Sequence, residues 1–340
     1  MHMADALISP VVGGIMWATS AGAASYSIKK IKLDLDEKKI PLMGVMGAFV
    51  FAAQMINFTI PGTGSSGHIG GGILLAILLG PYAGFLTMAS VLAIQALFFA
   101  DGGLLALGSN IFNLGFYTCF IAYPLIYKSI IKKGITKKRI FVGSLLASVI
   151  GLQLGSFSVV LQTFFSGITE LPLLSFLLLM QPIHLAIGLI EGLITAAVVT
   201  FVWSARPEIL EPINSKIRSK NMSYKKLIAV LLCSAVLIGS MLSWYASSNP
   251  DGLEWAIENI TGNAELESSE NLHTTLESFQ EKISFLPDYS LKTKVEVESN
   301  TPVDVGTSVS GLIGGLLTLF LAISIGLVIK LFKNKRLKEN

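Results

Sequence analysis

Eight long stretches without charge constrain this chain more than any other feature of its sequence. Seven contain no charged residue, and the stretch 171–205 contains only Glu191. They cover residues 8–28, 41–60, 69–100, 102–127, 140–169, 171–205, 227–249 and 306–329. About 20 apolar residues cross a bilayer as a helix, and a helix satisfies its own backbone hydrogen bonds in lipid. With 14% charged residues and a mean hydropathy of +0.67, the chain is not an ordinary soluble domain, a disordered protein or a nucleic-acid binder.

The basic residues indicate how the chain is oriented. Of the 25 lysine and arginine residues, 22 lie in the segments 29–39, 128–139, 206–226 and 330–338. The positive-inside rule places these segments in the cytoplasm. The polar segment 250–304 has 12 acidic residues against three lysines, a formal charge of −9. It lies between two stretches whose other ends are cytoplasmic, so we expect it to be extracytoplasmic, with the N-terminus outside and the C-terminus inside.

The stretch 69–100 decides how often the chain crosses the membrane. The segments 29–39 and 128–139 are both predicted to be cytoplasmic, so the chain must cross the membrane an even number of times between them. The stretches 41–60 and 102–127 supply two of these crossings. Its 32 residues are broken at Gly80-Pro81, which favours two further crossings. The first would be short, over about 68–80, and the second would cover about 82–99.

The predicted fold is an all-α polytopic membrane protein. We expect a seven-helix bundle and two further transmembrane helices that flank an extracytoplasmic domain. The first stretch lacks a preceding basic region and a cleavage site of small residues, so it is predicted to be a retained helix. The predicted domains are a transmembrane domain at 1–205, a cytoplasmic linker at 206–226, and a C-terminal module at 227–340 with an extracytoplasmic loop at 246–305.

Two of the four histidines lie at extracytoplasmic positions beside flexible backbone. His2 is the second residue, and His68 follows a Gly/Ser-rich run. The α-amine of Met1, the amide nitrogen of His2 and its Nδ1 can chelate one metal, and an imidazole from His68 completes a square of four nitrogens. This geometry suits Ni(II) or Cu(II). Because the amine and amide must be deprotonated, binding would weaken as the pH falls. Taken alone, each histidine is also compatible with a solvated residue.

Four polar residues near these histidines are candidates to support a bound metal. Asp5 would orient an imidazole, neutralise the metal or cap the first helix. Asn57, Ser65 and Ser66 would donate hydrogen bonds to the ligands or be solvated in their loop.

Four ionisable residues remain to be interpreted. His184 and Glu191 are seven residues apart on one helical face within a span, so they are functional candidates. Their pairing would hold the bundle together, which we favour, or support the metal loop. Asp101 is expected in a turn at the end of a span. His273 lies among acidic residues of the external segment and is expected to be solvated.

Several segments of the chain carry motifs that occur together in one known family. The chain starts MHMADALISP, and the other segments are 51–58, 67–71, 181–185 and 191–195. In these segments the sequence resembles the CbiM/NikM family, the substrate-binding (S) components of energy-coupling-factor transporters for nickel or cobalt. The resemblance covers about 1–205 and implies seven spans. It also implies a metal site built from Met1, His2 and His68. The planar geometry favours nickel, and cobalt stays open. No bound organic cofactor is expected.

The rest of the chain resembles the NikN-type, or PDGLE, module of the same transporters. The matching segments are 250–256, 286–289 and 306–308. The resemblance implies high-affinity uptake of a divalent transition metal in a prokaryotic cell membrane. It also implies two kinds of partner, a transmembrane T component and two cytoplasmic ATP-binding subunits. No G-x-x-x-x-G-K-[ST] phosphate loop occurs in the sequence, so ATP hydrolysis is expected from the partners.

Small residues recur every four positions in the second stretch, at Gly44, Ala48 and Ala52. Such spacing allows helices to approach closely, and the resemblance implies that this face docks on the T component. Packing within the bundle is the other interpretation. A proton-coupled secondary metal transporter using His184 and Glu191, or a membrane metal sensor, are the alternative functions.

Overall fold

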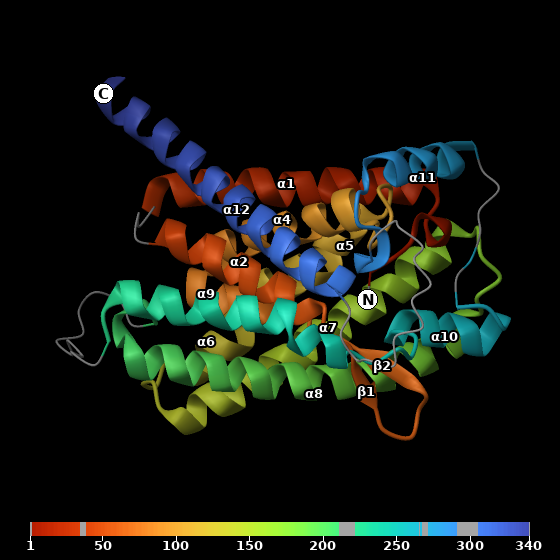
Figure 1. Cartoon of the computed structure of the whole chain (residues 1–340), viewed down its shortest axis with the longest axis horizontal. Helices are drawn as coiled ribbons and strands as arrows, with labels where there is room; N and C mark the ends of the chain where they lie inside the picture. Colours follow the sequence, from red (N-terminus) through yellow and green to blue (C-terminus); the bar gives the residue numbers. More distant parts are fainter. Residues whose placement is uncertain are drawn as a thin grey trace.

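The computed structural model describes residues 2–34, 39–210, 222–264, 266, 271–290 and 305–339. This part of the chain is mostly helical, and the helices run roughly along the long axis of the molecule (Figure 1). The expected all-α character is therefore confirmed, apart from one small hairpin. In chain order, the main helices are α1 (Pro10–Asp34), α2 (Lys39–Gln54), α3 (Gly72–Leu79), α4 (Pro81–Phe99), α5 (Leu107–Ile111), the π-helix η2 (Phe112–Tyr127), α6 (Lys128–Ile131), α7 (Lys137–Ser166), α8 (Leu173–Ala205), α9 (Tyr224–Ser240) and α12 (Val305–Glu339).

The predicted break in the stretch 69–100 is present. The short helix α3 ends at Leu79, and α4 begins at Pro81. Gly80 between them has φ 88°, a conformation that residues with a side chain rarely adopt. Pro81 is the first residue of α4, where its missing N–H is not needed. The helix therefore breaks at this dipeptide, which separates the short α3 from the full-length α4.

Within the described residues, five helices are long and apolar enough to cross a membrane. They are Pro81–Phe99, Leu107–Ile131, Lys137–Ser166, Leu173–Ala205 and Val305–Lys333. Large apolar side chains on α7 and α8, such as Phe157 and Leu178, are exposed on the outside of the bundle. An apolar surface of this extent fits a lipid environment rather than water. The seven-plus-two count of spans stays a prediction, since α1, α2, α3 and α9 are not among these five.

The C-terminal module packs its two long helices, α9 and α12, against α2. A side chain added at Gly44 would lie 2.6 Å from Ile323 of α12. Ala52 lies against Gly239 of α9, with 3.3 Å between the Cβ of Ala52 and a Cβ built on that glycine. Ala48 lines an apolar cavity of about 110 Å³ between the three helices. The face predicted for docking on a partner is thus covered within the chain, and its docking role stays a prediction.

The smaller elements gather at one end of the bundle. The strands β1 (Phe58–Ile60) and β2 (Ser65–Gly67) form an antiparallel hairpin in which Phe58 pairs with Gly67. The helices α10 (Gly252–Thr261) and α11 (Asn271–Ile283) and the single turn η5 (Pro287–Tyr289) come from the C-terminal module. The start of the chain lies toward this end, and the C-terminus extends from the opposite end (Figure 1).

Candidate metal site

The first residues of the chain form an arm that is fixed inside the bundle. The main-chain N–H of Met3 donates to Oδ1 of Asn110 at 2.8 Å, and Nδ2 of Asn110 donates to the Met3 carbonyl at 3.2 Å. The N–H of Gly103 donates to the same carbonyl at 2.9 Å. Oδ1 of Asp5 accepts the N–H of Ala106 at 2.9 Å. These bonds set the register of the arm and place the His2 side chain beside the loop that follows β2.

A buried carboxylate forms hydrogen bonds with the loop that carries His68. Glu191 of α8 accepts the N–H groups of Gly70 and Gly71 at 2.7 and 3.2 Å. Gln54 of α2 donates to the Gly70 carbonyl at 2.8 Å. Glu191 therefore supports the loop, which is one of the two roles that the sequence left open for it.

The two histidines predicted to share a metal lie face to face. The ring centroids of His2 and His68 are 5.0 Å apart, and the rings are inclined by only 8°. Both side chains are largely buried, with 8% and 7% exposed. Nδ1 of His68 lies 3.0 Å from the carbonyl oxygen of Ile69, which accepts only, so this nitrogen carries the proton and Nε2 carries the lone pair. Met1, the third predicted contributor, lies outside the described residues.

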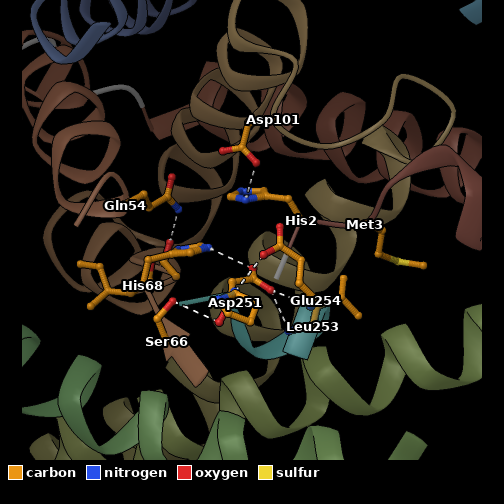
Figure 2. A network of polar contacts seen from close by, with 12 residues as sticks. His2, Met3, Gln54, Ser66, His68, Asp101, Asp251, Leu253 and Glu254 are labelled. Atoms are coloured by element: carbon orange, nitrogen blue, oxygen red, sulfur yellow. Dashed lines mark hydrogen bonds and ion pairs between the residues drawn. The ribbon is translucent and has the colours of Figure 1, made fainter. Parts of the chain in front are cut away.

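Asp101 is a neighbour of His2 that the sequence analysis treated only as a turn residue. Its Oδ1 lies 3.0 Å from Nδ1 of His2 (Figure 2), and its Oδ2 accepts the hydroxyl of Tyr289 at 2.5 Å. Burial raises the pKa of Asp101, but His2 and the Tyr289 hydroxyl outweigh burial and hold that pKa below its usual range. A charged Asp101 therefore orients the His2 ring, and a metal bound through Nδ1 would have to replace this contact.

Asp251 is a second carboxylate that the sequence analysis did not place at the site. Its Oδ2 lies 4.0 Å from Nε2 of His68 (Figure 2). Burial raises the pKa of Asp251, and nearby positive charge outweighs burial and lowers that pKa. Both Asp251 and Tyr289 come from the C-terminal module. No local sequence signal points to their contacts, because their partners lie more than 180 positions away.

The remaining candidates divide by their contacts. Ser66 donates through its hydroxyl to the Asn249 carbonyl at 2.7 Å, and Ser65 donates to the Ser66 carbonyl at 3.0 Å. The Asn57 carbonyl accepts the N–H of Ser247 at 2.7 Å. These residues join the hairpin to the C-terminal module.

His184 and His273 are both buried, although His273 was expected to be exposed to solvent. His184 is buried, its Nδ1 lies 2.8 Å from the Met180 carbonyl, and it lines a small cavity beside His68. His273, which was expected to be solvated, is 2% exposed, and its Nε2 lies 2.9 Å from the Ile8 carbonyl. The expectation for His273 was wrong because a contact with the N-terminal arm, rather than its acidic sequence neighbours, sets its surroundings.

The described residues contain no group of three or more His, Cys, Asp or Glu side chains placed to hold a metal. The ligand set proposed from the sequence uses main-chain nitrogen atoms beside the two imidazoles. A chain terminus with histidine at position 2 can supply them, since its amine and amide nitrogens lie next to the imidazole.

Binding at His68 should not depend on proton competition near neutral pH. Burial, aided by the nearby positive charge of His2 and opposed by Asp251, lowers the pKa of His68 to about 3. The imidazole is thus neutral from pH 5 to pH 8. We expect His68→Ala to weaken nickel binding by the same factor at both pH values, measured by calorimetry on the full chain in detergent. An imidazole with the usual pKa of about 6.5 would be about thirty-fold less available at pH 5, and a penalty that shrinks by this factor would contradict the prediction.

Fold and site together define a polytopic helical protein with an imidazole- and carboxylate-lined site at one end. Residues 2–209 match the family described as "Cobalt uptake substrate-specific transmembrane region" (CbiM), and residues 225–331 match the PDGLE domain. The chain belongs to the CbiM/NikM family and carries a fused NikN-type module.

Curated relatives and solved structures agree with this assignment. The chain is 32% identical over 330 residues to a "Putative fused nickel transport protein NikMN" of Archaeoglobus fulgidus, an alignment that covers 96% of this chain and 98% of that protein. It is 36% identical over 212 residues to a "Putative metal transport protein" of Haloquadratum walsbyi, covering 62% and 93%. A "Truncated Transition metal Transporter" of known structure aligns with a TM-score of 0.53 and 29% identity, covering 59% of this chain and 98% of that one.

Proposed function

We propose that this chain captures a divalent transition metal, nickel in preference to cobalt, as the membrane S component of an energy-coupling-factor transporter. The observation that carries the proposal is the stacked pair of imidazoles, 5.0 Å apart, at the end of the bundle where the chain begins. The relatives named as nickel and cobalt transport proteins support the choice of metals. A planar set of four nitrogens favours nickel.

The proposed ligands are the amine of Met1, the amide nitrogen and Nδ1 of His2, and Nε2 of His68. The fixed register of Met3 keeps the His2 amide next to the loop. Ion capture requires His2 to leave Asp101 and the amide to lose its proton, so nickel uptake releases protons. The metal would enter from outside the cell, where the N-terminus is expected to lie.

Transport into the cell would depend on partners. The sequence contains no P-loop motif, so we propose that two cytoplasmic ATP-binding subunits and a transmembrane T component drive the change that releases the metal inside. A proton-coupled secondary transporter would need no such partners.

Nickel accumulation by cells tests this division of labour. We expect cells that express the chain alone to accumulate no more nickel than control cells, and co-expression with a T component and ATP-binding subunits to produce uptake. Replacing the catalytic residues of the ATP-binding subunits should abolish that uptake. Uptake by the chain alone that a proton uncoupler stops would instead support the secondary transporter, and metal binding without any uptake would support a sensor.

A further inference from the structure

The signature of the C-terminal module, residues 250–254, lies directly on the loop of the metal site. The N–H of Ser66 donates to the Pro250 carbonyl at 2.8 Å, which extends the pairing of β2. Trp255 donates from its ring N–H to the Thr63 carbonyl at 2.9 Å. These bonds join segments more than 180 positions apart. They therefore fix the signature segment relative to His68.

Gly252 allows this close approach. A Cβ built on Gly252 would lie 2.5 Å from Ile183 and 3.4 Å from Cε1 of His184, so a side chain does not fit without movement of α8. Leu253, the next residue, is 2% exposed and anchors the start of α10 in the core. The backbone of the segment is thus pressed against α8, and the neighbouring Asp251 is directed at the site.

The two carboxylate oxygens of Asp251 have different surroundings. Oδ1 caps α10, accepting the N–H groups of Leu253 and Glu254 at 2.7 and 3.0 Å. Glu254 returns the interaction by accepting the N–H of Asp251 at 2.9 Å, which completes a capping box. Oδ2 is turned toward Nε2 of His68 at 4.0 Å. The cap therefore holds the carboxylate in one orientation while its second oxygen faces the proposed ligand atom.

A small cavity separates this carboxylate from α8. Its volume is about 10 Å³, and His68, His184, Asp251 and Gly252 are among the residues that line it. This is about the space of one water molecule. Nε2 of His184, which lines the same cavity, has no hydrogen-bond partner within the described part of the chain. The site is thus enclosed on this side, and a negative charge is fixed at its wall.

We propose that Asp251 is a metal-positioning residue that the PDGLE module supplies to the site of the transmembrane domain. The proposal rests on the function proposed above. Amine and imidazole ligands are neutral, and an ionised amide cancels only one of the two charges of the metal. A buried net charge is unfavourable, and the Asp251 carboxylate places negative charge 4.0 Å from Nε2 of His68, beside the proposed position of the metal. The charged carboxylate of Asp101 lies on the other side of His2 and accepts the Tyr289 hydroxyl, so Asp251 is the carboxylate on the His68 side of the site.

The capping role of Asp251 makes the test sharp. Asparagine and serine cap helices about as well as aspartate, so Asp251→Asn and Asp251→Ser remove the charge and keep α10. Glu258→Gln, on the exposed side of the same helix, removes one charge far from the site and is the matched control. The full chain in detergent is titrated with NiCl2, and its dissociation constant, visible spectrum, release of nickel to EDTA and melting temperature are recorded.

We expect both Asp251 variants to bind nickel roughly ten- to hundred-fold more weakly, the usual cost of losing a group that supports metal ligands. The spectrum and the melting temperature of the metal-free protein should stay those of the unchanged chain, and release to EDTA should be faster. Glu258→Gln should match the unchanged chain in every measurement. Wild-type affinity and release in either Asp251 variant that retains the melting temperature would overturn the inference, as would equal losses in Glu258→Gln.

His2→Ala, measured in parallel, separates this inference from the proposed function. If His2→Ala abolishes nickel binding while Asp251→Asn leaves it unchanged, Asp251 has no positioning role and the proposed site survives. If His2→Ala binds nickel with the original spectrum and affinity, the proposed site itself is wrong, and the inference about Asp251 falls with it.

Discussion

Three glycines added in front of Met1 are expected to abolish nickel binding. A single added residue would not suffice, because a histidine third from a free terminus can bind nickel through the amine, two amides and the imidazole. The addition converts the α-amine at this position into an amide, and the chelate of amine, His2 amide and His2 Nδ1 can no longer form. The arm cannot slide to compensate, because Asn110 and Gly103 hold both main-chain groups of Met3. We expect the affinity to fall by more than about a hundred-fold, since changes to groups that only support metal ligands already cost 10- to 100-fold.

Nickel content and the visible spectrum of the purified full chain provide the measurement. A low-spin square-planar band should be present in the unchanged protein and absent from the extended one and from His2→Ala. Three glycines appended after Asn340 add the same mass at the other end and should leave the band unchanged. An extended chain that retains the band and the affinity would rule out the amine as a ligand.

Replacing Glu191 with leucine is expected to cost both stability and metal binding. The carboxylate accepts two buried N–H groups, those of Gly70 and Gly71. Each buried donor left without an acceptor costs about 1–3 kcal/mol, so Glu191→Leu should lower the free energy of unfolding by about 2–6 kcal/mol. His68 precedes these glycines in the same loop, and nickel affinity should fall with the order of the loop.

A graded series makes the Glu191 prediction specific. Glu191→Gln keeps one oxygen acceptor and should lose about half as much stability as Glu191→Leu. Glu170→Gln, an exposed carboxylate just before α8, should behave like the unchanged protein. Melting curves and nickel titrations in detergent give both quantities. If Glu191→Leu melts and binds nickel as the unchanged chain does, the loop does not depend on this carboxylate.

The helices were predictable from sequence because lipid imposes a simple length rule on them. Each uncharged stretch contains a helix, and the Gly80-Pro81 break lies where the dipeptide predicts it. The pairing of His2 with His68 also followed from chemistry, since a histidine at position 2 needs one further imidazole to complete a planar set. The number of crossings could not be derived in this way, because four of the nine predicted spans, α1, α2, α3 and α9, are not among the described helices that are long and apolar enough to cross a membrane.

The contacts between the two parts of the chain were beyond sequence reasoning. Asp251 was recognised as part of a motif, and Asp101 as a turn residue, but neither pattern specifies a partner in space. His273 shows the same difficulty, because its acidic neighbours predict solvation and its contact with Ile8 buries it. Such long-range packing depends on how whole helices meet, and local periodicity does not describe that.

The covering of α2 by α9 and α12 has a consequence for how this protein would meet a partner in the membrane. Gly44 and Ala52 are in contact with helices of the same polypeptide, so a protein that docked on this face would compete with a tethered occupant. Tethering keeps the occupant at a high effective concentration, about millimolar for short flexible linkers. Covalent fusion would thus raise the partner concentration that is needed for docking on α2. Cutting the chain between 210 and 222 would lower that concentration, because α9 and α12 could then diffuse away.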